Sequence, residues 1–196
     1  MLASQMTQRL FKSKTFEGAV QAVLDDVIAL LGAEYGNVQL AIGDQLVIAA
    51  QRGLTADFLK TFRRVKKDDG SACGRALRIG EIVIIRDVES DPEFAAFRPD
   101  AKKAGFRSVQ STPFFTRDGN VLGMVSTHFA HAHEPTPIEI QTLKTYSIVA
   151  AEHLNKLLGD LPLASKAIQM SEALYPRILE QQGSAELRSP GISTSP

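Results

Sequence analysis

Hydrophobic residues recur at helical spacing in two long segments of the chain. In residues 15–32 the apolar residues that share one face are Phe16, Val20, Val23, Leu24, Val27, Ile28 and Leu31. Thr15 is placed to cap the start of this helix, and Gly32 is placed to end it. A second stripe later in the chain is formed by Ile140, Leu143, Tyr146, Ala150, Leu154 and Leu157. Before it stands Thr136-Pro-Ile-Glu139, a capping box with proline at the first helical position. The pattern predicts an amphipathic helix in each segment.

Extended segments lie between these two helices. Residues 37–42 and 45–51 flank the turn Gly43-Asp44. Residues 104–113 and 121–129 flank Asp118-Gly119, a strong hairpin signal. Each pair is expected to form an antiparallel hairpin. Residues 82–88 are rich in β-branched side chains, which is typical of a strand buried on both faces.

Shorter helical patterns cover residues 55–65 and 71–79, and helical turns are expected around Phe94 to Phe97 and from Pro99 to Gly105. The order is helix, two strands, short helices, strand, short helices, two strands, long helix. This order indicates an α+β fold rather than a doubly wound α/β fold. We expect a central antiparallel sheet with the long terminal helices on one face. Short helices and loops would cover a pocket on the other face.

The chain length favours one domain with extensions, since 196 residues bury one sizeable core. We expect that domain to span residues 14–160. Residues 1–13 would form an N-terminal helical extension, and residues 161–182 a C-terminal one that is interrupted at Pro176. Residues 183–196 are rich in Ser, Pro and Gly, and they are expected to be a disordered tail.

Composition narrows the function classes. The 22 Lys and Arg residues balance 22 Asp and Glu residues, so no overall charge favours a nucleic acid or an anionic membrane. No apolar run approaches the ~20 residues that span a bilayer, and the N-terminus lacks the apolar core of a secretory signal. A single cysteine excludes an internal disulfide and a thiolate-rich metal site, which fits a reducing compartment. The expected location is the cytoplasm.

Polar side chains in the middle of the second hairpin are the first candidates for a site. Ser108, Gln110 and Thr112 share one face of the first strand. Ser126 and His128 share one face of the second. Hydroxyl, amide and imidazole groups in mid-sheet border something other than a dry core. We therefore predict that Gln110 and His128 both point inward, on the helix-covered face of the hairpin.

Six short motifs occur in an order and at a spacing that resemble GAF domains, which are small-molecule sensor modules. They are Gly36–Leu40, Ala50–Gly53, Asp69–Ala76, Arg86–Val88 with Asp91-Pro92, Ala104–Pro113 and Leu122–Phe129. The resemblance covers about residues 14–158. It is greatest to the bacterial GAF domains that are joined to PAS domains, histidine kinases or response regulators. It implies a pocket between the sheet and the short covering helices.

The resemblance also implies which residues contact a ligand. The hairpin supplies Ser108, Gln110, Thr112, Ser126 and His128, and the covering segments supply Asp87, Phe94, Phe97 and Arg98. Ser71 and Cys73 stand at the start of a short helix, where backbone N–H groups and the helix dipole favour an anion. The sequence identifies no ligand and no cofactor.

The sequence lacks residues that three more specific functions need: methionine sulfoxide reduction, bilin attachment and metal binding. Free methionine sulfoxide reductases of the GAF type need a second thiol to close a disulfide, whereas Cys73 has none. Bilin attachment typically uses a Cys-His pair on a late covering helix, and residues 98–105 contain neither. His128, His131 and His133 lie close in sequence, but no Asp or Cys completes a metal site at ligand spacing. We expect a non-enzymatic domain without a bound metal.

The expected function is a sensory one. A small ligand or a redox cue would change the pocket, and the signal would pass to a histidine kinase, a response regulator or a second copy of the chain. A homodimer is expected because two terminal stripes lack a partner within the core: Leu2, Met6 and Leu10, and Ala167, Met170, Leu174 and Ile178. Three alternatives stay open. The chain could be a methionine sulfoxide reductase-like enzyme or a dimerisation scaffold with a degenerate pocket, or these stripes could fold back on their own chain.

Overall fold

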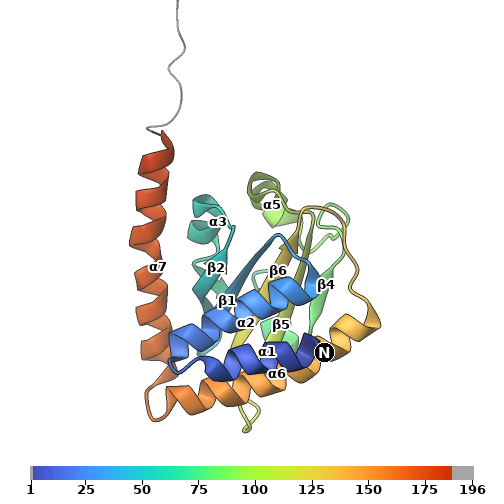
Figure 1. Ribbon diagram of the computed structural model, residues 1–196. Coiled ribbons are helices and arrows are strands. Elements are labelled where there is room, and N and C mark those ends of the chain that lie inside the picture. Colours follow the sequence, from blue (N-terminus) through green and yellow to red (C-terminus); the bar gives the residue numbers. More distant parts are fainter. Residues whose placement is uncertain (1, 187–196) are drawn as a thin grey trace, which may run out of the picture.

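The computed structural model of the protein describes residues 2–186, and a six-stranded antiparallel sheet forms its centre (Figure 1). The strand order is β3-β2-β1-β6-β5-β4. The strands are β1 (Tyr35–Ile42), β2 (Gln45–Arg52), β3 (Arg64–Lys66), β4 (Val83–Ile85), β5 (Ser108–Phe115) and β6 (Val121–Phe129). Both predicted hairpins, β1–β2 and β5–β6, are present.

Helices cover both faces of this sheet. One face carries α1 (Leu2–Lys12), α2 (Phe16–Leu31) and α6 (Pro137–Leu158). The other face carries α3 (Ala56–Thr61), α4 (Ala72–Ile79), the 3₁₀ turn η1 (Ala95–Phe97) and α5 (Arg98–Ala104). The last helix, α7 (Leu163–Glu186), contacts β2, β1 and α3. The predicted α+β fold is confirmed: the long helices α2 and α6 lie on one face, the short helices lie on the other, and α7 reaches both cores.

The ends of the two long helices follow the sequence signals. Thr15 Oγ1 accepts a hydrogen bond from Gly18 N at 3.1 Å, and Gly32 ends α2 with φ of 64°. At the start of α6, Thr136 N donates to Glu139 Oε2 at 2.7 Å, and Glu139 N donates to Thr136 Oγ1 at 3.3 Å. The capping box therefore satisfies two backbone donors that a helix leaves unpaired.

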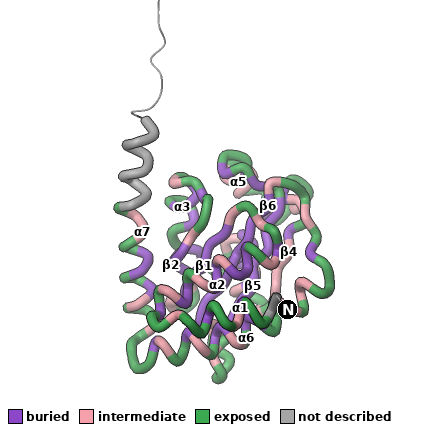
Figure 2. The backbone as a smooth tube through the Cα atoms, viewed as in Figure 1, coloured by how far each residue is buried: buried purple, intermediate pink, exposed green. Residues whose placement is uncertain are grey.

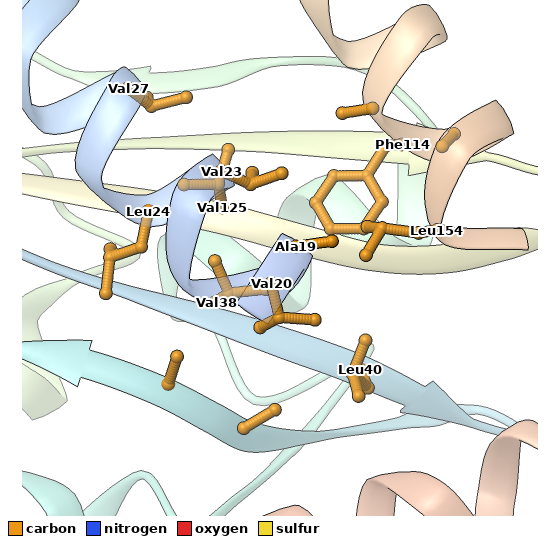
Figure 3. Close-up of a cluster of buried hydrophobic side chains, with 14 of the residues drawn as sticks. Ala19, Val20, Val23, Leu24, Val27, Val38, Leu40, Phe114, Val125 and Leu154 are labelled. Atoms are coloured by element: carbon orange, nitrogen blue, oxygen red, sulfur yellow. The ribbon is translucent and has the colours of Figure 1, made fainter. Parts of the chain in front are cut away.

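The main hydrophobic core lies between the sheet and helices α1, α2 and α6 (Figure 3). Val20 and Leu24 of α2 belong to this layer, together with Val38 of β1 and Phe114 of β5. Figure 2 shows the buried central strands enclosed by helices whose outer sides are exposed. A second core lies on the opposite face, beneath α3, α4 and α5. The sheet is thus buried on both faces.

The terminal helices pack on their own chain. Met6 and Leu10 of α1 are fully buried in the main core, and Ala167 and Met170 of α7 are buried there too. The premise that these stripes lack a partner is wrong, because they cover the core itself. The side chains of Leu2 and Ile178 lie outside the described residues. A homodimer stays a prediction, without this support.

Three element boundaries differ from the expectations. The helix expected over 55–65 ends at Thr61, and residues 64–66 instead pair with β2 as the edge strand β3. The strand expected over 82–88 is shorter than predicted, because only Val83–Ile85 form strand β4. Val83 and Ile84 are half-buried, because β4 is the other edge and pairs only with β5. A strand at the edge of a sheet is not enclosed as a central strand is.

The third difference concerns the C-terminal part of the chain. Helix α7 continues through Pro176 to Glu186, so Pro176 does not interrupt it. Residues 183–186 of the expected tail are therefore helical, and residues 187–196 lie outside the described part. Proline removes one backbone hydrogen bond, and the packing of α7 on the sheet outweighs that loss.

A buried carboxylate links the three helices of the main core. Asp26 of α2 is fully buried, and Tyr146 of α6 donates its hydroxyl to Asp26 Oδ2 at 2.6 Å. Arg9 of α1 forms an ion pair with the other oxygen. Burial raises the pKa of Asp26, and the hydrogen bond from Tyr146 and the charge of Arg9 partly offset that rise. The same burial, and the bond to Asp26, raise the pKa of Tyr146.

Within residues 2–186, no helix combines the length and the hydrophobicity that crossing a lipid bilayer requires.

Candidate functional site

The register of the β5–β6 hairpin decides which polar residues meet. Val109 pairs with His128, and Ser111 pairs with Ser126. Directly paired residues of an antiparallel ladder point to the same face. His128 and Ser126 therefore share a face with Val109 and Ser111, beneath the short helices.

Ser108, Gln110 and Thr112 point to the opposite face, because Gln110 pairs with Thr127. The prediction that Gln110 and His128 point to one face is wrong, although both are buried, at 1% and 3% exposure. The physical reason is that β5 carries polar residues on both faces. In addition, a register shift between Phe114 and Phe115 breaks the simple count back from the turn.

A small cavity lies between this polar face and the short helices. Its floor is formed by polar strand residues: Asn37, Gln39, Ser111, Ser126 and His128. Its walls include four phenylalanines: Phe58, Phe62, Phe94 and Phe106. The space that the centre of a water molecule can occupy in this cavity has a volume of about 20 Å³. Such a volume holds about one water. A cavity is therefore present at the expected place, and it is small.

Three polar atoms at this cavity have no hydrogen-bond partner within the described part of the chain. They are Asn37 Oδ1, Gln39 Oε1 and His128 Nδ1, and their residues are at most 3% exposed. Buried polar atoms are normally paired, because leaving them unpaired costs about 1–3 kcal/mol each. Their convergence on one cavity indicates a place where a polar guest, or a water, would be held.

His128 is enclosed by aromatic rings. Its ring meets Phe106 edge-on at 4.7 Å between centroids and Phe58 at 5.2 Å. Burial lowers the pKa of His128 to about 3, so the imidazole is neutral at physiological pH. A neutral imidazole offers one donor and one acceptor. Beside it, the hydroxyls of Ser111 and Ser126 bond to each other at 2.8 Å.

We predict that the protein loses stability as the pH falls below the ordinary His pKa of 6.5, because His128 stays neutral in the fold and gains a proton when the chain unfolds. This stability is present above pH 6.5 and is lost as the pH falls towards 3. The contribution of His128 to the slope is about 1.4 kcal/mol per pH unit within that window. Urea unfolding at pH 7, 6 and 5 measures it.

A His128→Gln variant should lose this slope, since glutamine does not titrate. His131→Gln is the matched control, because His131 is exposed and should leave the slope unchanged. Equal slopes in the wild type and in His128→Gln would contradict the assignment.

A carboxylate of the protein itself, that of Asp69, is bound at the start of α4. Ser71 N and Ser71 Oγ both donate to Asp69 Oδ1, at 2.9 and 2.6 Å, and Lys66 N donates to Asp69 Oδ2 at 3.2 Å. Ser71 Oγ in turn accepts from Gly74 N at 3.1 Å. The carboxylate of Asp69 thus occupies the position at which an anionic ligand was expected.

Cys73 faces the cavity from α4, and its sulfur lies 3.4 Å from Ser71 Oγ. Burial raises the pKa of the Cys73 thiol to about 11, against the opposing effect of the bond with Ser71. The thiol is therefore protonated at neutral pH, and a protonated thiol is a poor nucleophile.

The remaining candidates stand around the cavity. Phe94 lines it, and Phe97 packs on Phe94 with a centroid distance of 5.7 Å. Arg98 donates to the backbone oxygens of Val88 and Asp91, at 3.0 and 3.1 Å. Asp87 is ion-paired with Arg107 away from the cavity, and this bond lowers the pKa of Asp87. A ligand-binding role for any of them stays a prediction.

Sequence reasoning missed the contribution of β1. Asn37 and Gln39 alternate with the core residues Val38 and Leu40, which is the period-two pattern of a strand with a polar face. That signal was available in the sequence. Ser111 was missed for another reason, since choosing between it and Gln110 needs the hairpin register.

No group of three or more His, Cys, Asp or Glu side chains is placed to hold a metal ion within residues 2–186. His133 instead stacks on Phe129 with 3.9 Å between ring centroids.

A curated relative shares part of this sequence. The chain is 24% identical over 115 residues to the methyl sulfide methyltransferase-associated sensor of Methanosarcina acetivorans. The match covers 57% of this chain, and it spans only 11% of the length of that relative.

Solved structures share the fold at low sequence identity. The GAF domain of a phosphoenolpyruvate-protein phosphotransferase from Coxiella burnetii aligns with a TM-score of 0.68 and 18% identity, over 79% of this chain and 91% of that one. The free methionine-R-sulfoxide reductase of Neisseria meningitidis, solved with its substrate, aligns with a TM-score of 0.66 and 18% identity. That alignment covers 80% of this chain and 87% of the reductase.

The family model described as the GAF domain matches residues 13–154, which include the whole sheet, the short covering helices and the cavity between them. The chain belongs to the GAF domain family.

Proposed function

We propose that this GAF domain is a non-enzymatic sensory module that binds a small, uncharged ligand in the cavity between β1, β5, β6 and the short helices. The observation that carries the proposal is the set of three unpaired atoms, Asn37 Oδ1, Gln39 Oε1 and His128 Nδ1, at one cavity. Groups that stay buried without partners destabilise the empty fold, so a guest that pairs them is favoured.

The lining defines the chemistry of this guest. Every residue that lines the cavity is uncharged at neutral pH, since His128 has a pKa of about 3 and Cys73 one of about 11. A charged ligand would lose its hydration without meeting an opposite charge. Aromatic walls favour a flat apolar body, and the amides on the floor favour hydrogen bonds at one edge of it.

The ligand must widen the cavity, because about 20 Å³ accommodates little more than one water. Phe58 belongs to the six-residue helix α3, Phe62 caps the end of that helix, and Phe94 precedes a 3₁₀ turn. Such short elements move at lower cost than the central strands. A ligand that selects the widened state would shift the population towards it, which is the behaviour of a sensor.

Thermal-shift measurements on matched pairs of compounds test the charge requirement. Nicotinamide and nicotinate, and benzamide and benzoate, have nearly the same shape and differ in charge. We expect shifts from the amides and none from the carboxylates. A ligand at 100 times its dissociation constant stabilises the fold by about 2.7 kcal/mol, which such an assay detects. Shifts from the carboxylates alone would contradict the proposal.

Two glutamines provide a matched pair of variants. Gln39 and Gln110 are each 1% exposed, and each has an unpaired Oε1, but they lie on opposite faces of the sheet. Gln39→Leu should weaken binding of any compound found by the screen by about tenfold, the loss of one hydrogen bond. Gln110→Leu should leave the affinity within about twofold. The reverse pattern would move the site to the other face.

The non-enzymatic part of the proposal is supported by the state of the one cysteine. Cys73 is buried and its raised pKa keeps the thiol protonated, and a disulfide-forming cycle would need a second thiol that the sequence does not contain. A reductase assay with free methionine sulfoxide and a thiol reductant tests this. Turnover well above the buffer rate that disappears in Cys73→Ser would favour the enzyme instead.

The signalling partner is proposed from the sensor relative and from the sequence resemblance. We expect a histidine kinase or a response regulator to read the state of this domain, or a second copy of the chain to do so in a homodimer. Light scattering tests the homodimer, because a mass of 21.3 kDa in solution would be that of a monomer.

A further inference from the structure

We propose that α7 is a strap that holds α3 closed over the cavity, so that docking of α7 and opening of the cavity oppose each other. This inference rests on the proposed function, because it concerns how the ligand site is regulated. Helix α7 begins at Leu163, beyond residues 13–154, which match the GAF domain. Figure 1 shows α7 beside β2, next to α3.

Helix α3 is the part of the cover that a ligand would have to displace. Phe58 and Phe62 flank its last turn and line the cavity. The ring of Phe58 lies 5.2 Å from the His128 ring, centroid to centroid, directly over the polar floor. A guest that reaches His128 and Gln39 must move Phe58, and the rest of the six-residue helix moves with it.

Tyr175 of α7 fastens the end of this helix. Its hydroxyl donates to Leu59 O at 2.9 Å. In a longer helix Leu59 O would accept from Arg63 N, but Arg63 N bonds to Lys60 O at 3.4 Å as the helix ends. The guanidinium of Arg63 lies over the Tyr175 ring, 4.2 Å from its centroid. Tyr175 thus contacts both the carbonyl end of α3 and Arg63, two residues beyond the helix.

The first turns of α7 are anchored elsewhere. Ala167 and Met170 are buried in the main core, and Lys166 forms an ion pair with Glu17 of α2. Leu174 and Tyr175 pack instead against the second core, which contains Phe58 and Phe62. One continuous helix therefore connects the body of the domain to the cover of the cavity.

This connection predicts a reciprocal coupling. A ligand that displaces α3 would break the Tyr175 contact and loosen α7, and a partner that draws α7 away would ease opening. Linkage requires both effects to have the same magnitude. The position of α7 would then be what a partner reads.

The single cysteine allows a test that needs no ligand. Cys73 is 8% exposed and lines the cavity, so iodoacetamide can reach it only when the cover opens. When opening and closing are fast, the rate of labelling follows the population of the open state. In the full-length chain, Tyr175→Phe should raise the labelling rate about three- to tenfold, which corresponds to the loss of one hydrogen bond.

Tyr146→Phe is the matched control, because it removes a tyrosine hydroxyl bond from the opposite core. Urea unfolding of each variant gives its global stability. If labelling passes through the open cover, Tyr175→Phe accelerates it although its stability changes little, and Tyr146→Phe does not accelerate it. If labelling instead rises in proportion to the loss of global stability in both variants, the strap is wrong. An unchanged rate in Tyr175→Phe also overturns it.

These outcomes are separate from those of the ligand assay. Failure of every uncharged compound to bind, with faster labelling in Tyr175→Phe, would leave the strap standing and remove the ligand proposed for the cavity. Binding that is sensitive to Gln39→Leu, with unchanged labelling in Tyr175→Phe, would support the ligand site and overturn the strap.

Discussion

Replacing Phe114 by alanine is expected to lower the free energy of unfolding by about 3–5 kcal/mol. Phe114 is 1% exposed and lies in the main core, near Leu154 of α6 (Figure 3). Gly123 of β6 makes room for its ring, since a Cβ there would lie 2.7 Å from Phe114. Alanine loses the transfer free energy of the ring and leaves a void that a rigid sheet fills poorly. Urea unfolding measures the loss.

Phe115→Ala is the control for this prediction. Phe115 is the next residue of β5 and is 36% exposed, so its removal should cost less than about 1 kcal/mol. Similar losses in the two variants would mean that the core is not centred on the layer that holds Phe114.

The second large effect is expected at the buried carboxylate. Tyr146→Phe should lower the free energy of unfolding at pH 7 by about 1.5–3 kcal/mol, because the Tyr146 hydroxyl bonds to a charged group. Asp26 is fully buried, and afterwards its ion pair with the half-exposed Arg9 is left to neutralise it. In an Asp26→Asn background the same change should cost only about 0.5–1.5 kcal/mol, as for a neutral pair.

The pH dependence of Asp26→Asn gives an independent check. Burial raises the pKa of Asp26 in the fold above its ordinary value of 3.8. The stability from this group is therefore fully present below pH 3.8 and is lost as the pH rises through the folded pKa. The asparagine variant has no such loss, so its stability relative to the wild type should rise between pH 4 and pH 7. A falling difference would show that Arg9 and Tyr146 outweigh burial.

Local signals explain why much of the fold could be predicted. The period of the hydrophobic residues defines α2, and the Thr136–Glu139 capping box defines the start of α6, because both depend on residues a few positions apart. The turn Asp118-Gly119 likewise marks the β5–β6 hairpin. These features need no knowledge of distant parts of the chain.

Features that depend on distant contacts were the ones missed. The residues 64–66 form a strand only because β2 is there to pair with, and α7 passes Pro176 because the sheet supports it. The prediction of the site residues was incomplete for the same reason. Ser126 and His128 were placed correctly on one face, but their partner Ser111 follows from a register that a bulge shifts by one residue.

The neutral lining of the cavity has a consequence for how such a receptor would report. With His128 unprotonated above about pH 3 and Cys73 protonated below about pH 11, nothing in the lining changes charge under physiological conditions. Neutral contacts are also not screened by salt. The dose–response curve should therefore keep its midpoint when acidity or ionic strength fluctuates, and the output would follow the abundance of the ligand alone.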